Sequence, residues 1–176
     1  MIKNTKYKKY LLNRIKTKKI KIGIIGLGYV GLPLANAFSK KKISVLGFDI
    51  DKNKIQLLNY GKSYINYFSS KNIIEMYKNN FRATSNFSKI SEVDVIILCL
   101  PTPLKRNKSP EMSYIKNTLE KIFKFLKKGQ ALSLESTTYP GTSREYILPK
   151  LAKKLKIGSD FFLIYSPERE DPGNKK

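Results

Sequence analysis

Three glycines near the start of the chain have the spacing of a turn that binds phosphate. Gly26 closes the short apolar run 21–26, which has the character of a buried strand, and Gly28 and Gly31 follow it at the start of a helical pattern. In such a turn the first glycine permits a tight bend, the second lets a pyrophosphate approach the backbone, and the third lets helix and strand pack closely. The N–H groups and the dipole of the helix then favour the phosphates.

An acidic residue stands where the ribose of a dinucleotide would lie. Asp49 follows the second apolar run, 43–48, and a carboxylate there accepts hydrogen bonds from the ribose hydroxyls and repels a 2′-phosphate. The sequence therefore predicts NAD as the cofactor, in preference to NADP. The roles of two neighbours stay open. Asp51 has the position of a helix N-cap more than that of a ribose ligand, and Lys54 either reaches toward the adenosine or lies exposed on its helix.

Strand and helix patterns alternate along the rest of the chain. This rhythm predicts an α/β fold of the Rossmann type, a doubly wound parallel sheet of six strands with helices on both faces. The expected strands are 21–26, 43–48, 81–84, 93–100, 131–135 and 161–165. The expected helices are 29–41, 51–60, 70–79, 111–128 and 141–155, the last one interrupted by Pro149.

The first 19 residues are rich in lysine and contain no acid. Tyr7, Tyr10, Leu11 and Ile15 recur at helical spacing, which predicts a short amphipathic helix packed on the domain or on a partner subunit. A secretory signal is excluded because no apolar core is present, and a mitochondrial presequence is disfavoured because the arginine and serine bias is lacking. We therefore divide the chain into a basic helical extension, 1–19, and a dinucleotide-binding domain, 20–176.

The composition excludes several classes of function. There is no histidine and a single cysteine, so a histidine-dependent triad, a disulfide framework and a cysteine zinc cluster are ruled out. The formal net charge of +22 suggests nucleic-acid binding, but only five of the 35 basic residues are arginine and the lysines are spread over the whole chain. We expect nonspecific binding of polyanions at low salt only. No apolar run is long enough to cross a membrane, and the expected location is the cytoplasm.

Three loops with unusual composition follow the fourth, fifth and sixth expected strands, at 101–103, 136–142 and 166–173. Proline, glycine, serine and threonine are ordinary turn residues, so any one of these loops alone indicates little. In an open parallel sheet, however, ligands bind beyond the carboxyl ends of the strands. All three loops should meet the glycine turn at that edge, which favours a binding site there.

Three strings of sequence resemble the UDP-glucose/GDP-mannose dehydrogenase family. They are Gly26–Ala35, Glu135–Thr142 and Tyr165–Asn174, and the last two are highly specific. The similarity covers residues 5–174 and points to the branch that oxidises UDP-N-acetylglucosamine or UDP-N-acetylmannosamine. The resemblance implies oxidation of the sugar C6 alcohol to a carboxylate with two NAD molecules, for surface polysaccharide precursors. It also implies a cysteine thiolate that holds the aldehyde as a thiohemiacetal and then as a thioester.

The resemblance further implies roles for single residues. Thr137 matches a threonine that positions the reactive water, and Glu168 matches a general base that helps hydrolyse the thioester. An ion pair with Arg169 is the alternative role of Glu168. The implied NAD contacts are Gly26, Leu27, Gly28, Tyr29, Val30, Gly31 and Asp49, with Thr102, Pro103 and Ser136 toward the nicotinamide half.

The family's cysteine nucleophile lies in a motif that this sequence does not contain. Cys99 falls inside the apolar run 93–100 and has the setting of a buried core thiol. We therefore expect a dehydrogenase fragment that is inactive alone. The complete enzyme would bind a UDP-N-acetylhexosamine and form a homo-oligomer, or a second chain would carry the C-terminal half. The alternatives are a standalone NAD-binding module without catalysis and a basic nucleic-acid-binding protein.

Overall fold

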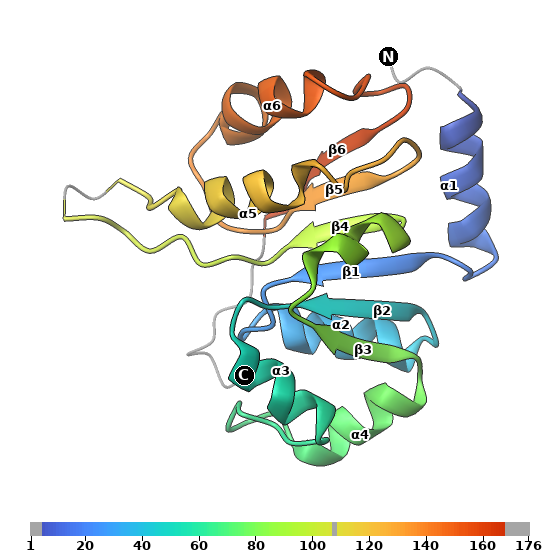
Figure 1. Cartoon of the computed structure of the whole chain (residues 1–176), viewed down its shortest axis with the longest axis vertical. Helices are drawn as coiled ribbons and strands as arrows, with labels where there is room; N and C mark the ends of the chain where they lie inside the picture. The colour runs from blue at the N-terminus through green and yellow to red at the C-terminus, as the bar shows by residue number, and fades with distance from the viewer. Residues whose placement is uncertain (1–4, 107–108, 168–176) are drawn as a thin grey trace.

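The computed structural model describes residues 5–106 and 109–167, which form one parallel sheet flanked by helices (Figure 1). The strand order is β3-β2-β1-β4-β5-β6, so the order reverses between β1 and β4. This is the doubly wound Rossmann sheet that the alternating pattern predicts. The strands are β1 (Lys21–Ile25), β2 (Ser44–Phe48), β3 (Phe81–Thr84), β4 (Val95–Leu98), β5 (Ala131–Leu134) and β6 (Phe162–Tyr165).

The predicted helices are present, with shorter bounds. They are α1 (Lys6–Lys16), α2 (Gly31–Lys40), α3 (Lys52–Asn59), α4 (Ser70–Lys78), α5 (Ser113–Phe123) and α6 (Leu148–Ala152).

The structure differs from the predicted helices in two details and confirms a third. Helix α5 ends at Phe123 because the chain turns there and places Leu126 in the core. The predicted interruption of helix 141–155 at Pro149 is confirmed: the segment divides into a π-helix, Thr142–Ile147, and α6, because Pro149 has no N–H to donate and is tolerated only in a first turn. A 3₁₀ helix, Phe87–Glu92, was not predicted.

Two apolar cores lie on opposite faces of the sheet. In β1, Ile24 packs into the core covered by α2, α3 and α4, whereas Ile25 packs into the core covered by α5 and α6. In β4, Ile97 and Ile96 divide between the two cores in the same way. Burial on both faces explains why the inner strands are apolar at successive positions. It also holds the carboxyl ends of the strands in fixed positions.

Helix α1 lies across the amino ends of the strands, at the edge opposite to their carboxyl ends (Figure 1). Leu11 is buried against the domain, and the Thr5 hydroxyl donates to the Ser159 carbonyl at 2.6 Å. The amphipathic helix expected from the sequence is therefore confirmed. Tyr10 and Ile15 from the expected apolar stripe are nevertheless 46% and 53% exposed.

A buried carboxylate fastens α1 to the start of β4. Asp94 accepts from the Tyr10 hydroxyl at 3.1 Å, from Arg14 Nε at 2.8 Å and from the backbone N–H of Lys21 at 2.8 Å. Only 6% of Asp94 is exposed. Three donors from two segments thus depend on one acceptor.

We expect the substitution Asp94→Ala to lower the free energy of unfolding by about 2–3 kcal/mol, because it leaves these donors without an acceptor. Urea unfolding followed by circular dichroism measures the change. The control is Glu92→Ala, which removes an exposed carboxylate 2.9 Å from Lys21 Nζ. It should cost less than about 0.5 kcal/mol. Equal losses in the two variants would contradict the role given to Asp94.

In the two described stretches of the chain, no helix combines the length and the apolar character that a membrane span requires.

Candidate dinucleotide-binding site

A cleft of about 980 Å³ opens at the carboxyl edge of the sheet, where the strand order reverses between β1 and β4. Ligands bind at this switch point in doubly wound sheets. The cleft brings together segments that are far apart in the sequence. The bordering residues that the sequence singled out are Gly26, Gly28, Tyr29, Val30, Asp49, Asp51, Lys54, Thr102, Ser136 and Thr137.

The three glycines have different surroundings. Gly26 has a φ of 93°, and a Cβ on it would lie 2.3 Å from the carbonyl oxygen of Cys99. A Cβ on Gly31 would lie 1.9 Å from the carbonyl oxygen of Gly26. For Gly28, which borders the cleft, no described residue other than its two chain neighbours has an atom within 4 Å of the corresponding position. The fold thus requires Gly26 and Gly31, whereas Gly28 leaves space that a ligand can occupy.

The N-terminus of α2 lies beside this space. In the described structure its N-cap, Val30, makes no side-chain capping bond, and the helix runs for 10 residues. Helix α3, by contrast, is capped by Asp51, which accepts from the N–H groups of Asn53 and Lys54. The N-cap role predicted for Asp51 is therefore confirmed. A helix N-terminus without a side-chain cap that borders a cleft favours the binding of an anion, because its free N–H groups can donate to it.

Asp49 stands after β2 and is only 8% exposed. Its Oδ2 accepts from the Leu27 N–H at 3.0 Å, and its Oδ1 accepts from the Asp51 N–H at 3.0 Å. Lys54 Nζ lies 4.0 Å from Oδ2. Because an ionised carboxylate offers about four lone-pair sites, both oxygens can still accept hydroxyl groups from the cleft. The side chain of Leu27, a predicted NAD contact, is fully buried and does not border the cleft, and its N–H holds Asp49 instead.

The loops after β4 and β5 are linked to each other. The Thr102 hydroxyl donates to the Thr137 carbonyl at 2.5 Å, and the Leu100 N–H donates to Ser136 Oγ at 2.9 Å. These bonds join two loops that are about 35 residues apart in sequence and place Thr102, Ser136 and Thr137 on the cleft wall.

The outcome differs for three other residues that the sequence singled out. Pro103 stands outside the cleft wall, and its carbonyl accepts from the Glu111 N–H at 2.8 Å. Glu168 lies outside the described residues. Cys99 packs against the core covered by α2, α3 and α4, as expected, but it is half-buried instead of buried and borders the cleft. Strand β4 ends at Leu98, one residue earlier, so Cys99 already belongs to the carboxyl edge.

Sequence reasoning missed the contribution of α5 to the cleft. Polar residues recur at every fourth position on one side of this helix, while Ile115, Leu119 and Ile122 enter the core. That spacing was the signal that could have found them. The bordering residues of α5 are Ser113, Tyr114, Asn117, Thr118 and Lys121.

A tyrosine supports the glycine turn. The Tyr64 hydroxyl donates to the Leu27 carbonyl, and Lys54 Nζ lies 5.6 Å from the centre of the Tyr64 ring. Burial, followed by the charges of Asp49 and Asp51, raises the pKa of the Tyr64 phenol above its ordinary value. The hydroxyl therefore remains a donor at neutral pH.

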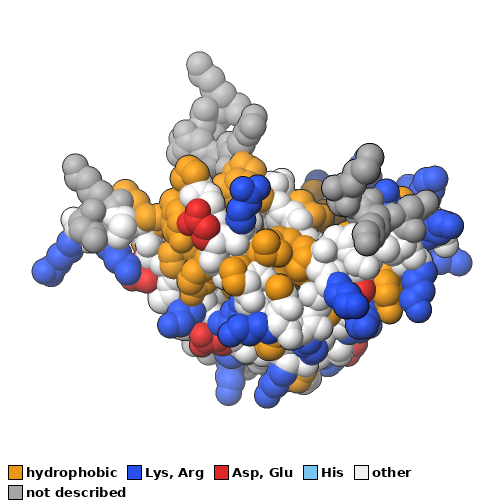
Figure 2. Space-filling model, turned by 90° about the horizontal axis from the view of Figure 1, so that it is seen from above, with side chains coloured by type: hydrophobic (Ala, Val, Ile, Leu, Met, Phe, Trp, Pro, Cys, Tyr) orange, Lys and Arg blue, Asp and Glu red, His pale blue; other side chains and the backbone are white. Residues whose placement is uncertain are grey.

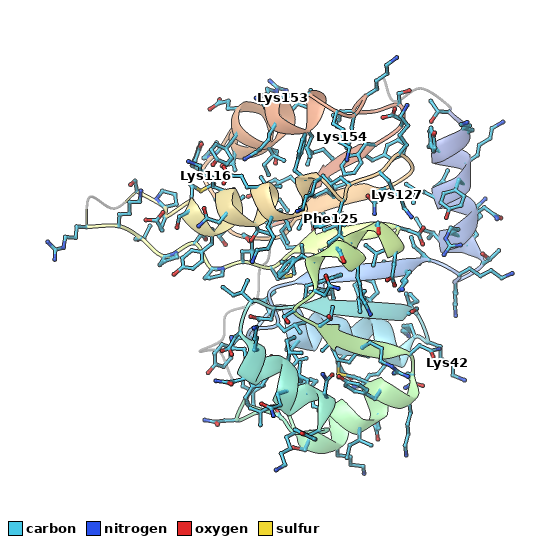
Figure 3. The ribbon with its side chains drawn as sticks, viewed as in Figure 1. Lys42, Lys116, Phe125, Lys127, Lys153 and Lys154 are labelled. Atoms are coloured by element: carbon cyan, nitrogen blue, oxygen red, sulfur yellow. The ribbon has the colours of Figure 1, made fainter. Side chains whose placement is uncertain are left out.

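The lysines of the domain are dispersed. Lys116, Lys127, Lys153 and Lys154 lie on the part of the molecule that holds α5 and α6, and Lys42 lies far from them (Figure 3). Lys154 has a structural partner, because its Nζ donates to carbonyl groups at the end of α5. In Figure 2 the basic side chains are scattered among apolar and polar ones. This distribution agrees with a solvated basic surface.

Fold and cleft together define a dinucleotide-binding domain of the Rossmann type. The family model described as "UDP-glucose/GDP-mannose dehydrogenase family, NAD binding domain" matches residues 20–176. The chain therefore belongs to the UDP-glucose/GDP-mannose dehydrogenase family, as its sequence motifs predicted. The match also confirms NAD as the cofactor of this kind of domain.

Three similar proteins have names that describe dehydrogenases of nucleotide sugars. UDP-N-acetyl-D-glucosamine 6-dehydrogenase of Pseudomonas aeruginosa is 39% identical over 161 residues, covering 90% of this chain and 37% of that protein. UDP-N-acetyl-D-mannosamine dehydrogenase of Campylobacter jejuni is 34% identical, covering 87% and 40%. The crystal structure of NDP-N-acetyl-D-galactosaminuronic acid dehydrogenase from Methanosarcina mazei Go1 has a TM-score of 0.81 at 33% identity, covering 96% and 38%. The chain thus spans well under half the length of these relatives.

Proposed function

We propose that this chain binds NAD in the cleft and forms the cofactor-binding part of a nucleotide-sugar 6-dehydrogenase. The reaction would oxidise the C6 alcohol of a UDP-N-acetylhexosamine to the acid. One observation supports this function above the others: Gly28, the uncapped start of α2 and Asp49 border a single cleft. The names of the relatives support the substrate class.

The residues present fit NAD. The open space at Gly28 and the start of α2 would receive the pyrophosphate, since backbone N–H groups and the helix dipole favour negative charge. Asp49 would accept hydrogen bonds from the ribose hydroxyls, and its buried charge would repel the 2′-phosphate of NADP. Ile50, which borders the cleft and is 67% exposed, offers an apolar surface for the adenine.

At the other end of the cleft, Thr102 and Ser136 would border the nicotinamide, the group that accepts the hydride when NAD is bound. The bond from Thr102 holds the main chain of Thr137 at the cleft wall. We assign Thr137 the positioning of the water that releases the acid. Glu168 is proposed as the general base for that water.

The remaining chemistry would come from sequence beyond this chain, since the matched relatives are much longer. We propose that it supplies the cysteine nucleophile and the UDP-sugar site, from the same polypeptide or from a second chain. In this assignment the complete enzyme is a homo-oligomer in the cytoplasm, and the chain alone is inactive.

Calorimetry with NAD and NADP tests the cofactor assignment. We expect the wild-type chain to bind NAD more tightly than NADP. The variant Asp49→Asn should bind NAD about tenfold more weakly, because it removes the charge and one acceptor oxygen. Its affinities for NAD and NADP should also become similar.

The matched control is Asp51→Asn, which removes the neighbouring carboxylate from the cleft wall but keeps an N-cap side chain. It should retain the affinity for NAD and the preference against NADP. Absence of NAD binding to the wild-type chain at millimolar concentration contradicts the proposed function. An equal effect of the two substitutions contradicts the specific role of Asp49.

A further inference from the structure

The segment between α3 and α4, residues 60–69, packs against the glycine turn. Two of its tyrosines donate hydrogen bonds to carbonyl groups of the turn. The Tyr64 hydroxyl donates to the Leu27 carbonyl, and the Tyr67 hydroxyl donates to the Tyr29 carbonyl at 3.0 Å. The rings of Tyr67 and Tyr29 also lie 5.8 Å apart, at an interplanar angle of 34°. The carbonyl groups of Leu27 and Tyr29 thus both accept hydrogen bonds from segment 60–69.

The planarity of the peptide bond carries this restraint to the next residue. The Leu27 carbonyl and the Gly28 N–H belong to one trans peptide unit, so they point in opposite directions. The same holds for the Tyr29 carbonyl and the Val30 N–H. A hydrogen bond that fixes the direction of each carbonyl therefore fixes the direction of the N–H group behind it.

The two sides of these peptide units have different surroundings. Within 5–106 and 109–167, the cleft wall includes Gly28 and Val30 but neither of the two tyrosines. When the carbonyls turn toward the tyrosines, the N–H groups of Gly28 and Val30 turn away from them. Gly28 is the residue beside the open space, and Val30 is the N-cap of α2.

The tyrosines stand on a rigid support. Ile65 and Phe68, which flank Tyr67 in the segment, are each 5% exposed and belong to the core under α2 and α4. Ser69 then caps α4 by accepting from the Asn72 N–H. The segment is therefore anchored independently of the turn, as a positioning device requires.

We propose that Tyr64 and Tyr67 are positioning residues for the cofactor, which aim the N–H groups of Gly28 and Val30 at its pyrophosphate. This inference rests on the proposed NAD binding. It extends the site to two residues that do not touch the cofactor and that no part of the glycine motif contains. The inference also predicts different effects on the two parts of the ligand. Binding of the diphosphate should depend on the tyrosine hydroxyls, whereas binding of the adenosine should not.

The test uses Tyr64→Phe and Tyr67→Phe, which remove the hydroxyls and keep the rings. Calorimetry with NAD and ADP, and an NMR titration with adenosine, give the dissociation constants. Each variant should weaken NAD and ADP by about three- to tenfold, the effect of losing one hydrogen bond that orients a ligand contact. Adenosine, which lacks phosphate, should bind equally to all forms. The ADP-induced amide shifts of Gly28 and Val30 should shrink in the variants.

The control is Tyr77→Phe. The Tyr77 hydroxyl donates to Asn59 Oδ1 at 2.6 Å, a bond that joins α4 to α3 without reaching the glycine turn. It should leave ADP binding unchanged. Tyr67 is 55% exposed, so Tyr67→Phe should fold even if the half-buried Tyr64 tolerates no change.

Two results would overturn the inference alone. One is wild-type affinity for ADP in both variants, and the other is an equal loss of ADP and adenosine, which would show a general loosening of the site. A wild-type chain that binds neither NAD nor ADP would refute the proposed function itself, and the inference with it.

Discussion

Replacing Gly28 by alanine should weaken NAD binding by about tenfold or more while the melting temperature stays within about 2 °C of the wild-type value. The φ angle of Gly28 is not positive, so alanine meets no backbone strain. In the described structure nothing but its two chain neighbours lies within 4 Å of the added methyl group, which would project into the open space of the cleft. The fold should therefore accommodate the methyl group, whereas the methyl group should obstruct the pyrophosphate of NAD.

Calorimetry with NAD and differential scanning fluorimetry without NAD provide the two readings. Adenosine serves as the control ligand, because it carries no pyrophosphate to meet the methyl group. Unchanged NAD affinity in Gly28→Ala would mean that the phosphates do not approach the backbone at this residue. A large drop in melting temperature would mean that the open space has a structural role.

Gly31→Ala should have the opposite profile, a loss of about 3 kcal/mol or more in the free energy of unfolding. The added Cβ would lie 1.9 Å from the carbonyl oxygen of Gly26 and 3.0 Å from its carbonyl carbon. These are backbone atoms of the turn, so no side-chain rotation relieves the clash. Helix α2 would have to move away from β1, which would open the core around Ile24.

Urea unfolding followed by circular dichroism measures this loss. Gly28→Ala, three residues earlier in the same turn, is the matched control for the loss of a glycine. An unfolding midpoint of Gly31→Ala equal to that of the wild type would contradict the close packing of α2 on β1. The pair of variants separates the glycine that the fold requires from the glycine that the ligand requires.

The sequence predicted the parts of the site that follow each other locally. Gly26, Gly28 and Gly31 lie between one strand and the next helix, and Asp49 follows the adjacent strand, so order along the chain was sufficient to bring them together. The polar side of α5 was within reach of the same reasoning, because its four-residue spacing is visible in the sequence.

Other features depend on tertiary contacts that leave no local pattern. Tyr64 meets Leu27 across 37 positions, and Tyr67 meets Tyr29 across 38. The two tyrosines lie in an irregular segment, and their spacing does not distinguish this segment from an ordinary surface loop. The bond between Thr102 and Thr137 exists only because β4 and β5 are neighbours in the sheet. The interruption at Pro149 was predicted from the proline, but the π-helical form of Thr142–Ile147 has no signature in the hydrophobic periodicity.

The docking of α1 has a consequence for the order of events during synthesis. Thr5 bonds to Ser159 across 154 positions, and the carboxylate that receives Tyr10 and Arg14 is 80 or more positions downstream. At about 5–20 residues per second, a ribosome reaches residue 159 roughly 8 to 30 seconds after residue 5. The basic helix thus emerges before the domain that it packs on, and its bond to Ser159 is among the last contacts to form. Until then, the apolar side of the helix, which includes Leu11, lacks the surface that buries it in the folded domain.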